Sequence, residues 1–86
     1  MFPMTTTTEV RLSSIVAANV RAQAAMRGWT QREMCRRLGI AVTAMSDRYR
    51  ERVPWTLDEL AQLAALFDIE VSDLVARPKG FEPLTF

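Results

Sequence analysis

The chemistry most available to this sequence is anion binding by arginine, because its arginines gather in one half of the chain. Segment 10–52 holds nine arginines against three carboxylates, a net charge of +6. Segment 53–86 holds two basic residues against six carboxylates, a net charge of −4, and Glu9 supplies the remaining −1. A concentration of guanidinium groups on one face favours a polyanionic partner. Two interpretations stay open on charge alone: a surface for nucleic acid, or two solvated faces of opposite sign.

Catalytic chemistry is poorly represented. The 86 residues include no histidine, and Cys35 is the only cysteine. Histidine is the commonest general base and transition-metal ligand, and a lone cysteine makes neither an internal disulfide nor a zinc site. The adjacent Asp58 and Glu59 are explained as first-turn helix stabilisers. We therefore expect no enzyme, metal site, cofactor or small-molecule ligand, and we expect a reducing, cytoplasmic location.

The polar residues best placed to meet a polyanion lie in segment 30–51, which is predicted to form two short helices. Thr30 and Glu33 have the spacing of a capping box, in which each side chain satisfies a backbone N–H of the first turn. Gly39 ends the first helix, and the second is expected over about 42–51. A helix of 8–9 residues, a turn of 3–4 residues with glycine and a helix of 9–10 residues are typical of a helix-turn-helix.

Three further helices are needed to cover this pair. Their predicted bounds, with the capping residues in parentheses, are 9–27 (Thr8, Gly28), 57–67 (Thr56, Asp68) and 71–76. Apolar residues at helical spacing are expected to form the core: Leu12, Val16, Val20, Ala24, Met34, Cys35, Leu38, Met45, Tyr49, Leu57, Leu60, Leu63, Ala64, Phe67, Val71, Leu74 and Val75. Trp29 and Trp55 are interpreted as packing residues.

The predicted fold class is therefore all-α, a compact five-helix bundle that contains a helix-turn-helix. We expect a flexible N-terminus over 1–8, a helix-turn-helix domain over 9–76 and an irregular C-terminal tail over 77–86, where two prolines and a glycine interrupt any helix. No stretch approaches 18 apolar residues, and the N-terminus lacks the pattern of a secretory signal. We expect no contact with a membrane.

Two separated stretches resemble the phage Cro/C1-type (XRE) family of helix-turn-helix proteins. Residues 28–40, Gly-Trp-Thr-Gln-Arg-Glu-Met-Cys-Arg-Arg-Leu-Gly-Ile, are similar to the family pattern G-L-T-Q-x-E-L-A-x-x-L-G-I. Residues 63–74 are similar to its closing pattern L-A-x-x-L-G-V-x-x-x-x-L. The resemblance covers about 12–76. It implies a lambda-repressor-like DNA-binding domain whose second motif helix enters the major groove of double-stranded DNA.

The resemblance also implies a role for individual positions. Expected base contacts are Val42, Thr43, Ala44, Ser46 and Asp47. Expected phosphate contacts are Thr30, Gln31, Arg48, Arg50 and Arg52. Arg36 and Arg37 are interpreted instead as surface charges.

The sequence departs from the family pattern in three respects. Many members pair an arginine late in the first helix with a glutamate late in the third, but these places hold Ala24 and Tyr49 here. The glutamines common at base-reading positions are missing, so no operator sequence can be transferred. Arg48 stands where an apolar residue is frequent, with its stem expected along the core edge and its guanidinium on phosphate.

The function implied is a sequence-specific transcriptional repressor that acts by operator occupancy, such as a temperate-phage immunity repressor or a Cro-like regulator in the cytoplasm and nucleoid of a bacterial host. A homodimer on DNA would suit two half-sites, and a monomer that dimerises only on DNA is equally compatible. The alternative is a protein-interaction module, such as an antitoxin, that docks a partner through its C-terminal half. Docking would then use the acidic second half, or the tail with Phe81, Leu84 and Phe86. A third interpretation of the tail is an apolar C-terminus that a protease recognises.

Overall fold

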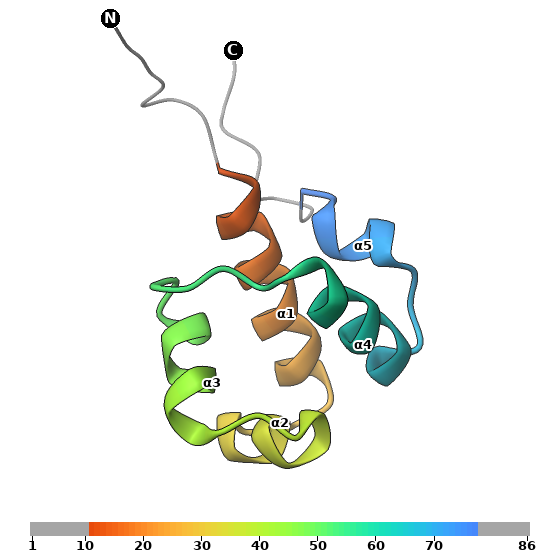
Figure 1. Ribbon diagram of the computed structural model, residues 1–86. Coiled ribbons are helices and arrows are strands. Elements are labelled where there is room, and N and C mark those ends of the chain that lie inside the picture. The colour runs from red at the N-terminus through yellow and green to blue at the C-terminus, as the bar shows by residue number, and fades with distance from the viewer. Residues whose placement is uncertain (1–10, 78–86) are drawn as a thin grey trace, which may run out of the picture.

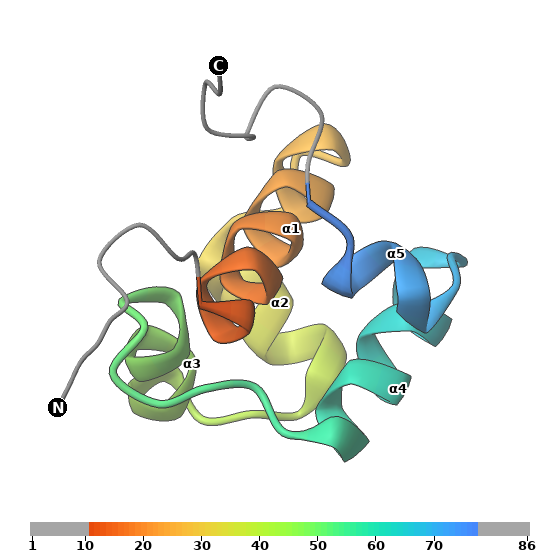
Figure 2. The same cartoon turned by 90° about the horizontal axis from the view of Figure 1, so that it is seen from above.

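The computed structural model describes residues 11–77, which form five helices around one core and include no strand (Figure 1). The helices are α1 (Leu12–Met26), α2 (Gln31–Leu38), α3 (Val42–Tyr49), α4 (Leu57–Phe67) and α5 (Val71–Val75). Helix α1 runs through the middle, with α3 on one side and α4 and α5 on the other, and α2 crosses one end (Figures 1 and 2). The predicted all-helical class with a helix-turn-helix is confirmed. None of the described helices is long and apolar enough to cross a membrane.

Local sequence signals account for most helix ends. The Thr56 hydroxyl accepts a hydrogen bond from the Glu59 backbone N–H at 3.1 Å, and the Glu59 carboxylate accepts one from the Thr56 N–H at 2.9 Å, a complete capping box. Gly28 and Gly39 take positive φ values of 73° and 70° after α1 and α2. Asp68 ends α4 at φ 59°, a left-handed geometry that aspartate tolerates better than most residues.

The core joins all five helices. Its largest fully buried side chains are Val20, Met34, Met45, Leu63, Phe67 and Leu74. Cys35 and Trp55 are also buried, and Trp29 stacks on Phe67 with ring centroids 5.9 Å apart. The interpretation of Cys35 and the two tryptophans as packing residues is confirmed.

A buried amide that the sequence did not single out attaches α5 to α1. Asn19, 8% exposed, donates hydrogen bonds of 2.8 Å to the carbonyl oxygens of both Leu74 and Ala76. These carbonyls lie at the C-terminal end of α5, where no intrahelical partner exists. Because every buried side-chain polar atom of residues 11–77 has a partner, Asn19 stabilises the contact without leaving an unsatisfied group.

Several predicted boundaries and core positions were wrong. Helix α1 begins at Leu12 and not near 9, because Arg11 is extended at φ −68° and ψ 141°; Thr8 lies outside the described residues. Helix α3 ends at Tyr49, before Glu51, which has a positive φ of 63°. Leu12 and Leu57 are 58% and 83% exposed, because each lies on the first turn of its helix, where no other helix covers it. Val71, on the first turn of α5, is also exposed.

Candidate nucleic-acid interface

The turn between α2 and α3 is built by three residues, 39–41. The backbone N–H groups of Gly39 and Ile40 both donate to the Cys35 carbonyl, at 2.8 and 3.1 Å, which closes the end of α2. The left-handed Gly39 then redirects the chain, and the extended Ala41 opens α3. Met34 of α2 and Met45 of α3 are fully buried, so the two helices are held on the core at a defined angle.

The outward face of α3 carries the predicted base contacts. Thr43 is exposed, and Ser46 and Asp47 are half-buried. Positions three or four apart share one helix face, so these residues lie together, opposite the buried Met45. Val42, 58% exposed, and the half-buried Ala44 flank them.

The predicted phosphate contacts at the start of α2 lie at a helix N-terminus. The Thr30 hydroxyl accepts a hydrogen bond from the Glu33 N–H at 3.1 Å, and Gln31 is the first helical residue. Unpaired N–H groups and the helix dipole favour an anion at this end. Arg50 and Arg52, just after α3, are both exposed. The Arg52 N–H donates to the Asp47 carbonyl at 2.8 Å, which ties this loop to the last turn of α3.

Arg48 is placed differently from the sequence expectation. Its Nε donates to Glu59 Oε1 at 3.0 Å, and its second terminal nitrogen lies 2.8 Å from Glu59 Oε2. The guanidinium also donates to the Ala44 carbonyl and lies over the Trp55 ring. With only 14% of its side chain exposed, Arg48 faces α4, a geometry that argues against the expected phosphate contact. No feature of the sequence matched Arg48 to Glu59 among the ten acidic residues.

Residues 19–80, most of the chain, match the family model of the Cro/C1-type HTH DNA-binding domain. The chain belongs to this family. It is thus a DNA-binding transcription regulator, in a family that is typically non-enzymatic.

Two solved structures share the fold of this Cro/C1-type protein. A hypothetical transcription factor from Neisseria, NHTF, is 26% identical with a TM-score of 0.75, over 93% of this chain and 92% of that one. The clp gene regulator ClgR from C. glutamicum is 24% identical with a TM-score of 0.67, over 77% of this chain and 86% of that one. A search of curated protein sequences finds no match.

Other polar contacts join α1 to α3 at the place where many Cro/C1-type proteins are expected to carry an ion pair. Ala24 is buried and Tyr49 half-buried, but Arg21, one turn before Ala24, donates to the Tyr49 carbonyl at 3.1 Å. The same guanidinium lies 3.6 Å from the carboxylate of Glu51, which also accepts a hydrogen bond from the Ser14 hydroxyl at 2.9 Å. The departure at Ala24 and Tyr49 therefore does not leave the junction without charged contacts.

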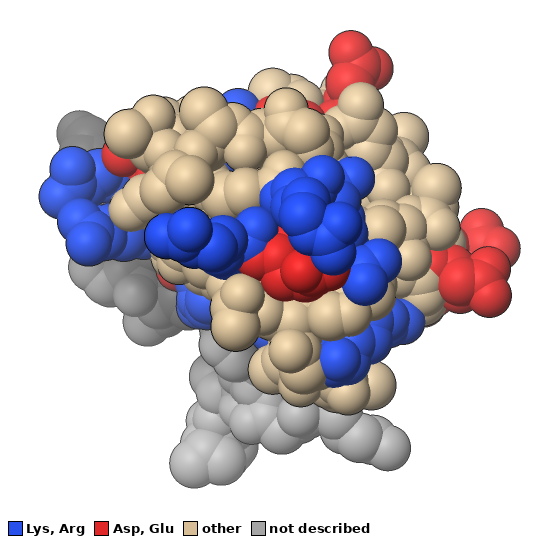
Figure 3. Space-filling model, turned by 90° about the horizontal axis from the view of Figure 1, so that it is seen from below, with Lys and Arg blue, Asp and Glu red and all other residues tan. Residues whose placement is uncertain are grey.

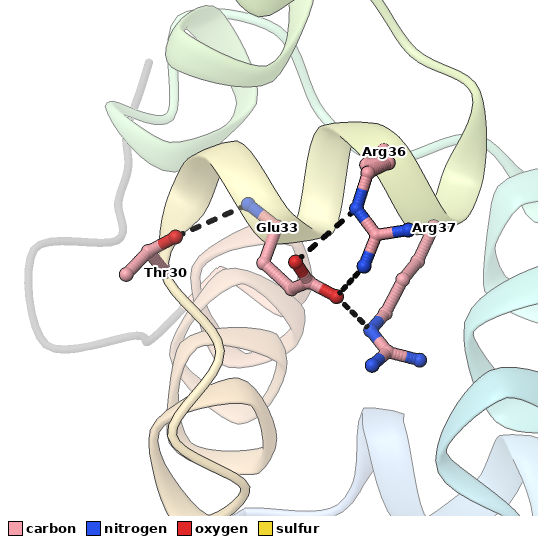
Figure 4. A network of polar contacts seen from close by, with 4 residues as sticks. All are labelled: Thr30, Glu33, Arg36 and Arg37. Carbon is pink, nitrogen blue, oxygen red and sulfur yellow. Dashed lines mark hydrogen bonds and ion pairs between the residues drawn. The ribbon is translucent and has the colours of Figure 1, made fainter.

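The basic side chains on α2 surround an acidic one. Arg36 and Arg37 both pair with Glu33, and Arg37 Nε lies 2.6 Å from its carboxylate (Figure 4). Seen from this end, blue arginine surface borders a red patch above and on both sides (Figure 3). Burial raises the pKa of the Glu33 carboxyl, but hydrogen bonds and charge from Arg36 and Arg37 outweigh it and lower the pKa below its usual value.

These contacts correct the capping-box prediction in part. The Thr30 hydroxyl caps the Glu33 N–H as expected, whereas the Glu33 carboxylate turns to the two arginines and not back to the Thr30 N–H. The Arg37 guanidinium also lies 4.0 Å from the centroid of the Trp29 ring. Arg37 therefore does more than solvate the surface, because it covers a core aromatic.

Proposed function

We propose that this chain is a sequence-specific transcriptional repressor that occupies an operator and excludes RNA polymerase, as a phage immunity repressor or a Cro-like regulator would. The single observation that carries this proposal is the outward face of α3, which presents short polar side chains beside the N-terminus of α2 within a Cro/C1-type domain. Similarity to the hypothetical transcription factor from Neisseria and to the clp gene regulator supports a role in transcription. Operator occupancy requires only this DNA-binding surface.

In the proposed complex, α3 lies in the major groove and its outward face meets the base edges. Thr43 and Ser46 offer hydroxyl groups that bond to several bases, and Asp47 accepts a hydrogen bond from a cytosine amino group. Val42 and Ala44 supply apolar contact to a thymine methyl. Short side chains suit this position because they allow the helix to approach the bases closely.

The proposed phosphate contacts flank the groove on both sides. Thr30 and Gln31 present the N-terminus of α2 to one strand, and Arg50 and Arg52 reach the backbone after α3. We propose binding as a homodimer to two half-sites one helical turn apart, in the cytoplasm and nucleoid of a bacterial cell.

The test is a comparison of equilibrium binding to DNA from the region upstream of the gene and to random duplex, across a salt series. We expect the upstream DNA to bind at least about a thousandfold more tightly, with affinity falling steeply as salt rises. Ser46→Ala should lower the ratio of the two affinities. Arg50→Ala should weaken both equally and reduce the salt slope by about one.

Arg77→Ala is the matched control, because it removes a positive charge that is also exposed but lies beyond α5, and it should leave the salt slope unchanged. Equal, weak binding of the upstream and random duplexes by the wild-type protein would contradict the proposal.

A further inference from the structure

The recognition helix α3 is held to α4 by one bidentate ion pair between Arg48 and Glu59. Both carboxylate oxygens take part, at 3.0 Å from Arg48 Nε and 2.8 Å from its terminal nitrogen. The side chains are only 14% and 17% exposed. A two-point contact between planar groups fixes orientation as well as distance, which a single-point contact cannot do.

Glu59 is itself immobilised from the α4 side. Its Oε1 accepts a hydrogen bond from the Thr56 backbone N–H at 2.9 Å, and its own N–H donates to the Thr56 hydroxyl. Burial raises the pKa of the Glu59 carboxyl, yet hydrogen bonds and charge from Arg48, with hydrogen bonds from Thr56, bring it below its usual value. The carboxylate is therefore a charged, fixed acceptor at the start of α4.

Arg48 is immobilised from the α3 side. Its other terminal nitrogen donates to the Ala44 carbonyl, one turn earlier in α3, at 3.2 Å. Its guanidinium carbon lies 5.6 Å from the centroid of the buried Trp55 ring. The position of α3 is thus transmitted to α4 through groups that have little freedom to rotate.

Helix α3 has few other attachments. Met45 is its only fully buried side chain, the half-buried Tyr49 packs against the core, and a hydrogen bond from Arg21 to the Tyr49 carbonyl holds its last turn. Met45 and Tyr49, four positions apart, attach one face of the helix to the core, and a rotation of the helix about its own axis would displace both. The contact between Arg48 and Glu59 opposes such a rotation, because it lies off the axis and is directional.

We infer that Arg48 is a positioning residue for DNA reading: paired with Glu59, it sets the orientation of α3 and so the sequence discrimination, without touching DNA. The inference rests on the proposed function. A hydrophobic pair of the same volume would often stabilise a fold equally well. The distinctive contribution of the ion pair is therefore its direction, which sets the orientation of α3. In proteins generally, residues that do not contact a ligand can change the energetic coupling to its binding site by roughly twofold to thirtyfold.

The experiment uses the full chain and a duplex that the wild-type protein selects from a random library, with a scrambled duplex of the same composition. The variants are Arg48→Met, Glu59→Gln, the double variant and Arg48→Lys. Glutamine keeps the carbonyl oxygen that can cap Thr56 while removing the charge. All affinities are measured at a temperature at which circular dichroism shows each variant to be fully folded, so loss of stability alone does not change them.

Arg27→Met is the matched control. Arg27 also joins two helices, through a 2.7 Å hydrogen bond to the Phe67 carbonyl at the end of α4, and it carries the same charge. Because it does not contact α3, its loss should lower the melting temperature but leave the discrimination ratio unchanged.

We expect the ratio of the two affinities to fall roughly tenfold in Arg48→Met and in Glu59→Gln, with the double variant no worse than the larger single loss. Arg48→Lys should recover part of the ratio, and the salt slope should stay that of wild type in Glu59→Gln and Arg48→Met.

Three results would overturn the inference. A uniform loss on both duplexes with a salt slope reduced by about one in Arg48→Met would make Arg48 a phosphate contact. An unchanged ratio in Glu59→Gln would remove the ion pair from DNA reading, and an equal loss in Arg27→Met would assign the effect to general loosening of the fold. If the wild-type protein selects no sequence, the proposed function fails and this inference fails with it. That outcome is distinguishable from the three above because it is seen before any variant is compared.

Discussion

The turn of the helix-turn-helix depends on the backbone of Gly39, which makes Gly39→Ala an informative perturbation. Gly39 has φ 70° and ψ 32°, the left-handed region that side chains disfavour. A Cβ added at this position would meet no atom within 4 Å. The whole effect of the substitution is therefore conformational, with no contribution from a clash.

The magnitude follows from two opposing terms. Holding alanine in the left-handed region costs roughly 1–2 kcal/mol. Replacing glycine also restricts the unfolded chain, which returns about 0.4–1 kcal/mol. The net loss should be about 1 kcal/mol, and for a domain of this size the melting temperature should fall by about 4–8 °C.

The assay is thermal and urea unfolding followed by circular dichroism. Gly39→Asn should lose less than Gly39→Ala, because asparagine tolerates the left-handed region. Gly28→Ala is the matched comparison: its φ is 73° and its Cβ also meets nothing within 4 Å, so the loss should be the same. A loss above about 3 kcal/mol, or an asparagine variant no more stable than the alanine variant, would contradict a purely conformational cause.

Three further predictions concern α4. Asp68→Asn should stabilise the protein by about 0.3–1 kcal/mol, because it removes a negative charge from the C-terminal end of the helix dipole. This gain in unfolding free energy should shrink in 1 M salt, and a gain that salt does not change would contradict this cause. Leu57→Ala should lower the free energy of unfolding in urea by less than about 0.5 kcal/mol, because Leu57 is 83% exposed. Leu60→Ala, at a position 6% exposed, should lower it by about 2–5 kcal/mol, and similar losses at both positions would refute the burial pattern. The pKa of Glu59 is lowered from 4.5 in the folded state, so its charge stabilises the fold above that value and the contribution is lost as pH falls through the folded pKa. Urea unfolding across pH should therefore show the difference between wild type and Glu59→Gln shrinking on the acid side, and a difference constant across pH would refute the assignment.

The local features of this protein could be predicted from the sequence because they depend on neighbours along the chain. Thr30 and Thr56 cap helices through groups three residues away, and Gly39 turns the chain through its own backbone freedom. The helical spacing of apolar residues located the core of α2 and most of that of α4, although Leu57 proved exposed. The two family patterns rest on these same short spacings, and the Cro/C1-type match confirmed the family and the fold that they implied.

Contacts of polar side chains between different helices could not be predicted from the sequence, because they depend on how the helices pack. Arg48 and Arg50 stand two places apart and looked equivalent, yet Arg48 pairs with Glu59, eleven residues along the chain, while Arg50 is exposed. Arg21 contacts the end of α3 across 28 residues, and Asn19 holds α5 across more than fifty. Long polar side chains have many rotamers of similar energy, so the partner is chosen by what folding brings within reach. Short-range sequence signals therefore predicted most of the helices and caps and the family, whereas packing determined which arginines are exposed and which are engaged in contacts with other helices.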